Sequence, residues 1–359
     1  MPRSPEVAEL IRRMRVSHEN CLTRELDLTS YRFRSTDTAL WLEPVGAVLG
    51  IDKLYFRFDP SRPKDTDIHL GRDQFCKVLK IPTAFFRDNR PSLQETFVRN
   101  WFSVLTPGDK KSLFQFRLRQ GAEMTAIRAL LSKDETDMPH HKVLSALLPE
   151  CEDAIDMLES SGDTQDARML EAKFLIGPEI TIAGEPYRLG LYLQASELGV
   201  SNLIVDAFLY HLPTESTFVI TFDRDSVLSI GYNGTQPKDM ETLLLGVVPD
   251  LQALVPEIIQ RVEASHSYGF SGIKSTLAHF TSFLPKDILE KLRREVEGSF
   301  HTVGSDGEDT ELQEQDHPWW GVKGFTLGMS GVAKGLTGGK RRMLEKQAGY
   351  LLDLKFPKK

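Results

Sequence analysis

Apolar residues change their spacing along the chain near residue 165, and this change separates two kinds of structure. In the first part, apolar positions three or four apart alternate with strand-like runs. The elements expected there are helices over 5–14 and 71–81, strands within 31–58 and over 112–119, and an aromatic-rich link over 85–102. Two further short helices are expected between 141 and 160, with Pro149 at the first position of the second helix.

After residue 165 the pattern has a period of two, which predicts strands joined by turns. The candidate strands are 170–176, 179–183, 186–195, 202–211, 216–221 and 226–232. Because no helix separates them, we expect an antiparallel meander. Ser196, Glu197 and Gly199 should form the tight turn between two long strands, with Gly199 in a conformation that other residues resist. Helical patterns return over 240–264 and 285–297.

These patterns predict an α+β protein, with an antiparallel sheet core, flanking helices and a basic C-terminal helix. The organisation expected is an N-terminal α+β region over 1–160, an antiparallel sheet plus helices over 166–300, an acidic linker over 302–316 and the basic C-terminal helix over 318–359.

Composition narrows the class of protein. The chain has 359 residues, of which 40% are hydrophobic and 26% charged, as in ordinary globular proteins. Three scattered cysteines favour a reducing compartment. The N-terminus lacks the apolar core of a signal peptide, and no apolar stretch has the length of a spanning helix. We therefore expect a cytoplasmic protein without a membrane partner.

The net charge of −7 is unevenly distributed. Residues 141–320 carry 12 Lys and Arg against 30 Asp and Glu, whereas residues 321–359 carry 9 against 2. A basic tail on an acidic body is typical of an arm that binds nucleic acid or an acidic partner. The alternative is that tail and body attract each other.

Enzymatic motifs are missing. The sequence GLTGGKRR at 335–342 lacks the spacing of a phosphate-binding loop, and no Gly-x-Ser-x-Gly elbow occurs. His140 and His141 are adjacent, so their side chains point apart and cannot form one metal-binding face. No catalytic residue, metal site or cofactor is predicted, which favours a non-enzymatic protein over a small-molecule enzyme.

Basic residues alternate with aromatic residues on the strand expected over 112–119. Phe114 and Phe116 would share one face, and Arg117 and Arg119 the other, where they could track phosphates. The alternative is an ordinary sheet with an apolar inner face and a solvated outer face. In the tail, basic residues crowd one end of the last helix near two tryptophans, although its apolar positions equally suit a docking helix. The candidate nucleic-acid-binding residues are Arg117, Arg119, Arg128, Lys340, Arg341, Arg342, Lys346, Trp319 and Trp320.

Several segments in order resemble the phage/plasmid-related protein family of unknown function. They are LKIPTAFF at 79–86, the segment 114–132 with Arg128, Ala129 and Ser132, the segment 187–212 with Ser196, Glu197 and Gly199, and the closing basic helix. A Tyr after Ser132 and a Cys-x-Asn-Gly motif, both frequent in that family, are missing here. The resemblance implies an origin in a virus or mobile element, and no established chemistry.

The leading functional hypothesis is a phage-encoded, non-enzymatic accessory protein of replication or recombination. It would bind single-stranded nucleic acid in the host cytoplasm. The alternative is a phage structural or assembly protein, in which the tail and the N-terminal helix join protomers into a homo-oligomer.

Overall fold

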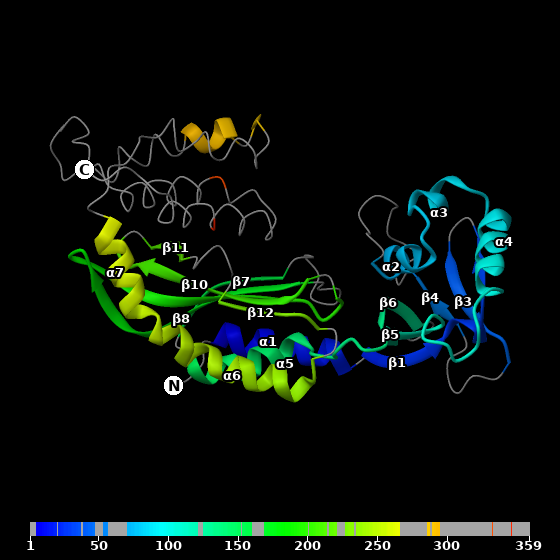
Figure 1. The fold of residues 1–359 in the computed structure, drawn as a ribbon, viewed down its shortest axis with the longest axis horizontal. Coiled ribbons are helices and arrows are strands. Elements are labelled where there is room, and N and C mark those ends of the chain that lie inside the picture. The colour runs from blue at the N-terminus through cyan, green and yellow to red at the C-terminus, as the bar shows by residue number, and fades with distance from the viewer. Residues whose placement is uncertain are drawn as a thin grey trace.

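The computed structural model contains two lobes, each built on its own sheet (Figure 1). The N-lobe comprises the described residues of 21–132, and the C-lobe comprises residues 5–19 and the described residues from 136 onward. The residues that the structure describes are 5–19, 21–36, 39–46, 53–56, 70–120, 125–151, 153–159, 169–199, 201–213, 215–220, 227–232, 235–265, 286–287, 289–294, 332 and 346. The expected α+β class with an antiparallel-rich sheet core is confirmed.

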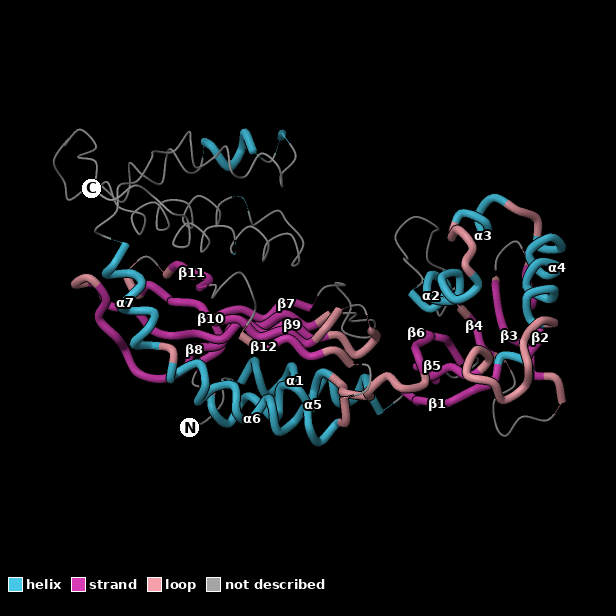
Figure 2. Tube along the Cα trace, in the orientation of Figure 1, coloured by secondary structure: helices cyan, strands magenta, loops and turns pink. Residues whose placement is uncertain are grey.

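The N-lobe sheet has six strands, and a single pair among them, β4 with β6, runs parallel within the described residues. In spatial order the strands are β1 (Cys21–Asp27), β5 (Leu113–Gln120), β6 (Thr125–Ser132), β4 (Leu54–Tyr55), β3 (Leu40–Pro44) and β2 (Tyr31–Ser35), with a short 3-10 turn η1 (Leu28–Ser30) between β1 and β2. The helices are α2 (Leu70–Leu79), α3 (Ala84–Asp88) and α4 (Pro91–Phe102). They gather on one side of this lobe (Figure 2), where Phe33, Phe75 and Phe116 form the centre of an aromatic core.

The C-lobe sheet is the predicted antiparallel meander. Its strands are β7 (Asp153–Glu159), β8 (Leu170–Ile182), β9 (Glu185–Ala195), β10 (Leu203–His211), β11 (Ser216–Ile220) and β12 (Leu228–Ile230), the last paired with β10. The first two predicted strands are one strand, β8, whose pairing with β9 is irregular between Leu175 and Glu179. A Cβ atom at Gly190 would lie 2.1 Å from the Phe208 ring, so this position requires glycine.

Helices cover one face of the C-lobe sheet. They are α1 (Pro5–Glu19), α5 (His140–Leu147) with the 3-10 turn η2 (Leu148–Glu150), α6 (Pro237–Ala253) and α7 (Val255–Ser265). Ile11 and Met14 of α1 lie in the same core as Val143 and Leu147 of α5. The two helices lie side by side in Figure 1. The first helix of the chain therefore belongs to the C-lobe, although the sequence between it and α5 builds the N-lobe.

Three sequence-based expectations need correction. The helix expected after Pro149 is wrong: η2 ends at Glu150, and β7 then pairs with β8 through a bulge between Ala154 and Asp156. The expected boundary at residue 160 is also wrong, because α1, α5 and β7 belong to the C-lobe. The aromatic link over 85–102 is mostly helical, since α3 and α4 occupy it.

Within the described part of the chain, no single helix is long and apolar enough to span a membrane. The helices α6 and α7 reach that length only together, and they are bent by 41° at their junction. The linker expected over 302–316 lies outside the described residues, as does the C-terminal helix expected over 318–359 apart from positions 332 and 346.

Candidate functional site

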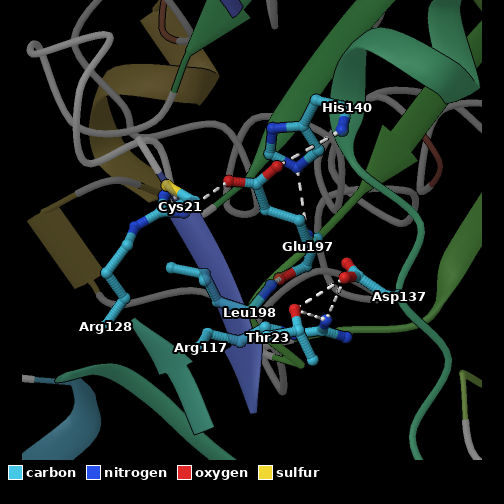
Figure 3. A network of polar contacts seen from close by, with 9 residues as sticks. Cys21, Thr23, Arg117, Arg128, Asp137, His140, Glu197 and Leu198 are labelled. Carbon is cyan, nitrogen blue, oxygen red and sulfur yellow. Dashed lines mark hydrogen bonds and ion pairs between the residues drawn. The ribbon is translucent and has the colours of Figure 1, made fainter. Parts of the chain in front are cut away.

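The predicted basic strand face is not exposed. Arg117 and Arg119 each retain only 5% exposure, so the expectation of a solvated basic face on β5 is wrong. The reason is tertiary packing. Asp137, on the connection between the lobes, and Glu197, in the turn after β9 of the C-lobe, bring carboxylates to this end of the N-lobe sheet. Arg117, together with Arg128 of β6, belongs to a buried polar network between the lobes (Figure 3).

Arg117 forms one half of the network. Its Nη1 lies 2.6 Å from Oδ2 of Asp137 and donates a hydrogen bond to Oγ1 of Thr23, also at 2.6 Å. Its Nη2 donates to the carbonyl oxygen of Thr136 at 3.1 Å. The backbone N–H of Thr136 donates in turn to the carbonyl of Tyr232 in the C-lobe. Arg117 therefore joins β1 and β5 to the segment that connects the lobes.

Arg128 forms the other half. Its Nη1 lies 2.9 Å from Oε1 of Glu197, and the two side chains retain 7% and 13% exposure. The same nitrogen donates to Sγ of Cys21 at 3.3 Å. Glu197 belongs to the turn after β9, so this ion pair crosses directly from one lobe to the other (Figure 3).

Residues of both lobes contact the turn that contains Glu197. Gly199 has φ +67°, as predicted for this position, and a Cβ atom there would lie 2.6 Å from the Leu131 side chain. Nε2 of Gln74 on α2 donates to the carbonyl of Leu198, while Oε1 of Gln74 accepts from the backbone N–H of Leu130. The predicted structural turn is thus also the point where the C-lobe contacts β6.

His140 fixes the Glu197 carboxylate from the C-lobe side. The Glu197 backbone N–H donates to Nε2 of His140 at 3.2 Å, and the His140 backbone N–H donates to Oε2 of Glu197 at 3.3 Å. Because Nε2 accepts a hydrogen bond, it carries no proton. Burial lowers the pKa of His140, which agrees with a neutral ring. Burial alone would raise the pKa of Glu197, but the charge and hydrogen bond of Arg128 and the hydrogen bond from the backbone N–H of His140 outweigh it, and that pKa is about 2.

The groups in this network suit a structural connection between the lobes. Burial raises the pKa of the Cys21 thiol, which makes it a poor nucleophile. Among the described residues, no group of three or more His, Cys, Asp or Glu side chains could hold a metal ion. The arrangement can hold two lobes in a fixed relation through paired charges.

We expect stability to fall as the pH drops below about 6.5, the ordinary histidine pKa. Burial lowers the pKa of His140, and burial with the nearby His18 and Arg15 lowers that of His141 to about 4. The unfolded chain therefore binds protons below pH 6.5 that the folded protein does not, so acid favours unfolding. Glu197 stays ionised throughout this range. Melting temperatures measured from pH 7.5 to 5 should decline, and less steeply in H140Q/H141Q. Equal slopes for both proteins would contradict this assignment.

The opposite end of the same sheet face presents a different surface. Along β2 and β3, Phe33 and Leu42 are buried under the helices, so their neighbours Arg32, Arg34 and Trp41 point to the other side. Trp41 pairs across the strands with Tyr55, and the ring centroids are 6.0 Å apart. Nζ of Lys53 lies 5.7 Å from the Trp41 ring centroid. We call Arg32, Arg34, Trp41, Lys53 and Tyr55 the open face.

The open face combines aromatic and basic groups. Arg32 and Lys53 are exposed, and Trp41 and Tyr55 are half-buried. Arg34 pairs with Glu43 at 3.0 Å and lies 3.8 Å from Glu95. Stacking surfaces bordered by cations suit a polyanion with exposed bases.

The C-terminal candidates are placed only in part. Nζ of Lys346 lies 3.2 Å from Oδ1 of Asp206 on β10, and the Asp206 side chain retains only 2% exposure. This contact favours attraction between tail and body, the alternative interpretation of the charge asymmetry, at the one tail cation described. Lys340, Arg341, Arg342, Trp319 and Trp320 lie outside the described residues.

Comparisons with protein-family models, with curated proteins and with solved structures were made for the whole chain. None of the three finds a match. The resemblance to the phage/plasmid-related family therefore stays a prediction from the sequence. The function has to be argued from the residues of the open face and of the network between the lobes.

Proposed function

We propose that this protein binds single-stranded nucleic acid without catalysing a reaction, as a phage-encoded accessory factor of replication or recombination in the host cytoplasm. The observation that carries the proposal is the open face, where Trp41 and Tyr55 lie side by side across β3 and β4, with Arg34 as the cross-strand neighbour of Trp41 and Lys53 over the Trp41 ring. Aromatic side chains stack on bases of any sequence, and neighbouring cations contact the phosphates.

The charge of the lobes supports the same location. Residues 21–132 carry 18 Lys and Arg against 13 Asp and Glu, whereas residues 141–320 have a large acidic excess. A polyanion is therefore attracted to the N-lobe and repelled by the C-lobe. The proposed contact thus moves from the β5 arginines, which are buried, to the β2–β3–β4 end of the same sheet.

The phage origin and the role in replication or recombination rest on the sequence resemblance alone. A structural or assembly role, the alternative, would require contacts between protomers. Binding to nucleic acid and self-association are separately measurable, so the two functions can be distinguished.

The test is a titration of labelled oligothymidylate of about 30 nucleotides, several times the length that one sheet module covers. We expect binding at about 50 mM salt and marked weakening by about 200 mM, because released counterions drive the association. Duplex DNA of the same length should bind more weakly, since its bases cannot stack on Trp41 and Tyr55. Absence of binding at low salt would contradict the proposal.

A further inference from the structure

The two edges of the N-lobe sheet meet at η1. The edge strands β1 and β2 stand at opposite ends of the strand order, but only the three residues of η1 separate them along the chain. The six strands laid flat would place these edges about 24 Å apart, whereas the chain from Asp27 to Tyr31 reaches at most about 14 Å. The sheet therefore curls until its edges join, and the backbone N–H of Leu28 donates there to the Ser112 carbonyl before β5. We call this curled sheet the N-lobe barrel.

One row of side chains runs around the outside of the barrel. The register places five residues next to one another on β2, β3, β4, β6 and β5, in the order Arg34, Trp41, Tyr55, Ala126 and Arg119. The exposure of the row changes between β4 and β6. Trp41 and Tyr55 are half-buried, whereas Ala126 and Arg119 retain only 3% and 5% exposure. The open face is thus the accessible part of a longer outer surface.

The C-lobe covers the outer surface of β6, the strand beside β4. Leu130 of β6 belongs to the core of the N-lobe. Its neighbours Ala129 and Leu131 point outward and form a separate cluster with Leu198, in the turn after β9. A Cβ atom at Gly199 of this turn would lie 2.6 Å from the Leu131 side chain, so turn and strand are in close contact. A chain of nucleotides on the open face cannot continue across β6, because the C-lobe occupies that surface.

The cations of the covered surface already have partners. Nη1 of Arg128 on β6 lies 2.9 Å from Oε1 of Glu197, and the arginine side chain retains 7% exposure. Nη1 of Arg117 on β5 lies 2.6 Å from Oδ2 of Asp137, and this side chain retains 6% exposure. A phosphate would have to displace a carboxylate to reach either guanidinium. The exposed cations of the open face have no such obstacle.

From this arrangement we infer that the C-lobe limits the length of the bound strand, and that the open face takes a single-stranded segment of about four nucleotides. Trp41 and Tyr55, whose ring centroids are 6.0 Å apart, stack on two neighbouring bases. Arg32 and Lys53, which are exposed, contact the phosphates beside them. This inference rests on the proposed function. It specifies the ligand as a short unpaired stretch, such as a gap or a tail, and not a long strand that many copies coat.

The test measures how binding depends on the length of the strand. The full-length protein is titrated with labelled oligothymidylates of about 2 to about 16 nucleotides at about 50 mM salt. The affinity per binding register should rise up to about four nucleotides and then stay constant, because further nucleotides meet no further part of the site. The slope of log K against log salt should level off at no more than about 2, the value for about three phosphate contacts on a single strand.

Two exposed arginines at opposite ends of the strand order provide a matched pair of variants. Arg32 lies on β2 and belongs to the open face, whereas Arg24 lies on β1, beyond β6 and β5. R32A should weaken the binding of every length that binds, by a similar factor, because it removes a phosphate contact that all of them make. R24A should bind strands of all lengths as the natural protein does.

The outcomes separate this inference from the proposed function. An affinity per register that keeps rising to about 16 nucleotides would overturn the limit on length and leave single-strand binding intact. A loss of affinity for the longest strands in R24A would do the same, because it would mean that the strand passes around the barrel to β1. Absence of binding at every length would overturn both.

Discussion

Replacement of Arg128 by alanine is expected to destabilise the folded protein by about 3–5 kcal/mol, the usual cost of removing one partner from a buried ion pair. Glu197 would remain at the junction with little exposure and without the guanidinium 2.9 Å away. Cys21 would also lose its contact with Arg128. Because whole domains are stable by only about 5–15 kcal/mol, such a loss is a large part of the total.

Chemical denaturation of R128A, E197A and the double variant measures this effect. The double variant should lose less than the sum of the two single variants, because removing both charges leaves neither uncompensated. Arg12 provides the matched control. Its Nη2 lies 2.7 Å from Oε1 of Glu9, a comparable distance, but the two side chains are 65% and 48% exposed. R12A should therefore have no measurable effect.

A similar small effect for R128A and R12A would contradict the structural role of the pair. So would strict additivity of R128A and E197A, because it would mean that the two side chains act independently. Either result would leave the contacts of Gln74, Leu131 and Leu198 as the main connection between this turn and the N-lobe.

The sequence predicted the C-lobe strands after β7 because their apolar residues follow a local pattern. Along β9 and β10, buried apolar residues recur at every second position, and Gly199 marks the turn between the strands. The same reasoning failed after Pro149, where Ile155 and Leu158 are three residues apart and suggest a helix. The bulge between Ala154 and Asp156 interrupts the period of two in β7, so no local pattern indicated a strand.

Neighbouring residues in the sequence could not predict that the β5 arginines are buried. Arg117 alternates with Phe116 as a solvated residue would, and its partner Asp137 is twenty residues away on the connection between the lobes. The same alternating signal occurs at Arg32, Phe33 and Arg34, where it does mark the side of the sheet away from the helices. The pattern thus identifies the face of a strand, whereas tertiary contacts decide which part of that face stays accessible.

Replacement of Trp41 by alanine should weaken binding of oligothymidylate by roughly 5- to 140-fold, which corresponds to the loss of about 1–3 kcal/mol of stacking on one base. Trp41 also lies under Lys53, so its removal takes away the surface that positions this cation. Y55A should have an effect of similar size, because Tyr55 is the cross-strand neighbour of Trp41. W41F, which keeps an aromatic ring, should retain most of the affinity. Fluorescence anisotropy at constant low salt measures all three variants.

The dependence on salt separates stacking from phosphate contacts at the open face. K53A should reduce the slope of log K against log salt by about 0.7, the value for one phosphate contact on a single strand. W41A should weaken binding at every salt concentration and leave that slope nearly unchanged, because a stacked ring releases few counterions. F97S, on the opposite side of the sheet, serves as the control and should bind oligothymidylate normally. If W41A and F97S bind equally well while both remain folded, the open face is not the nucleic-acid-binding surface.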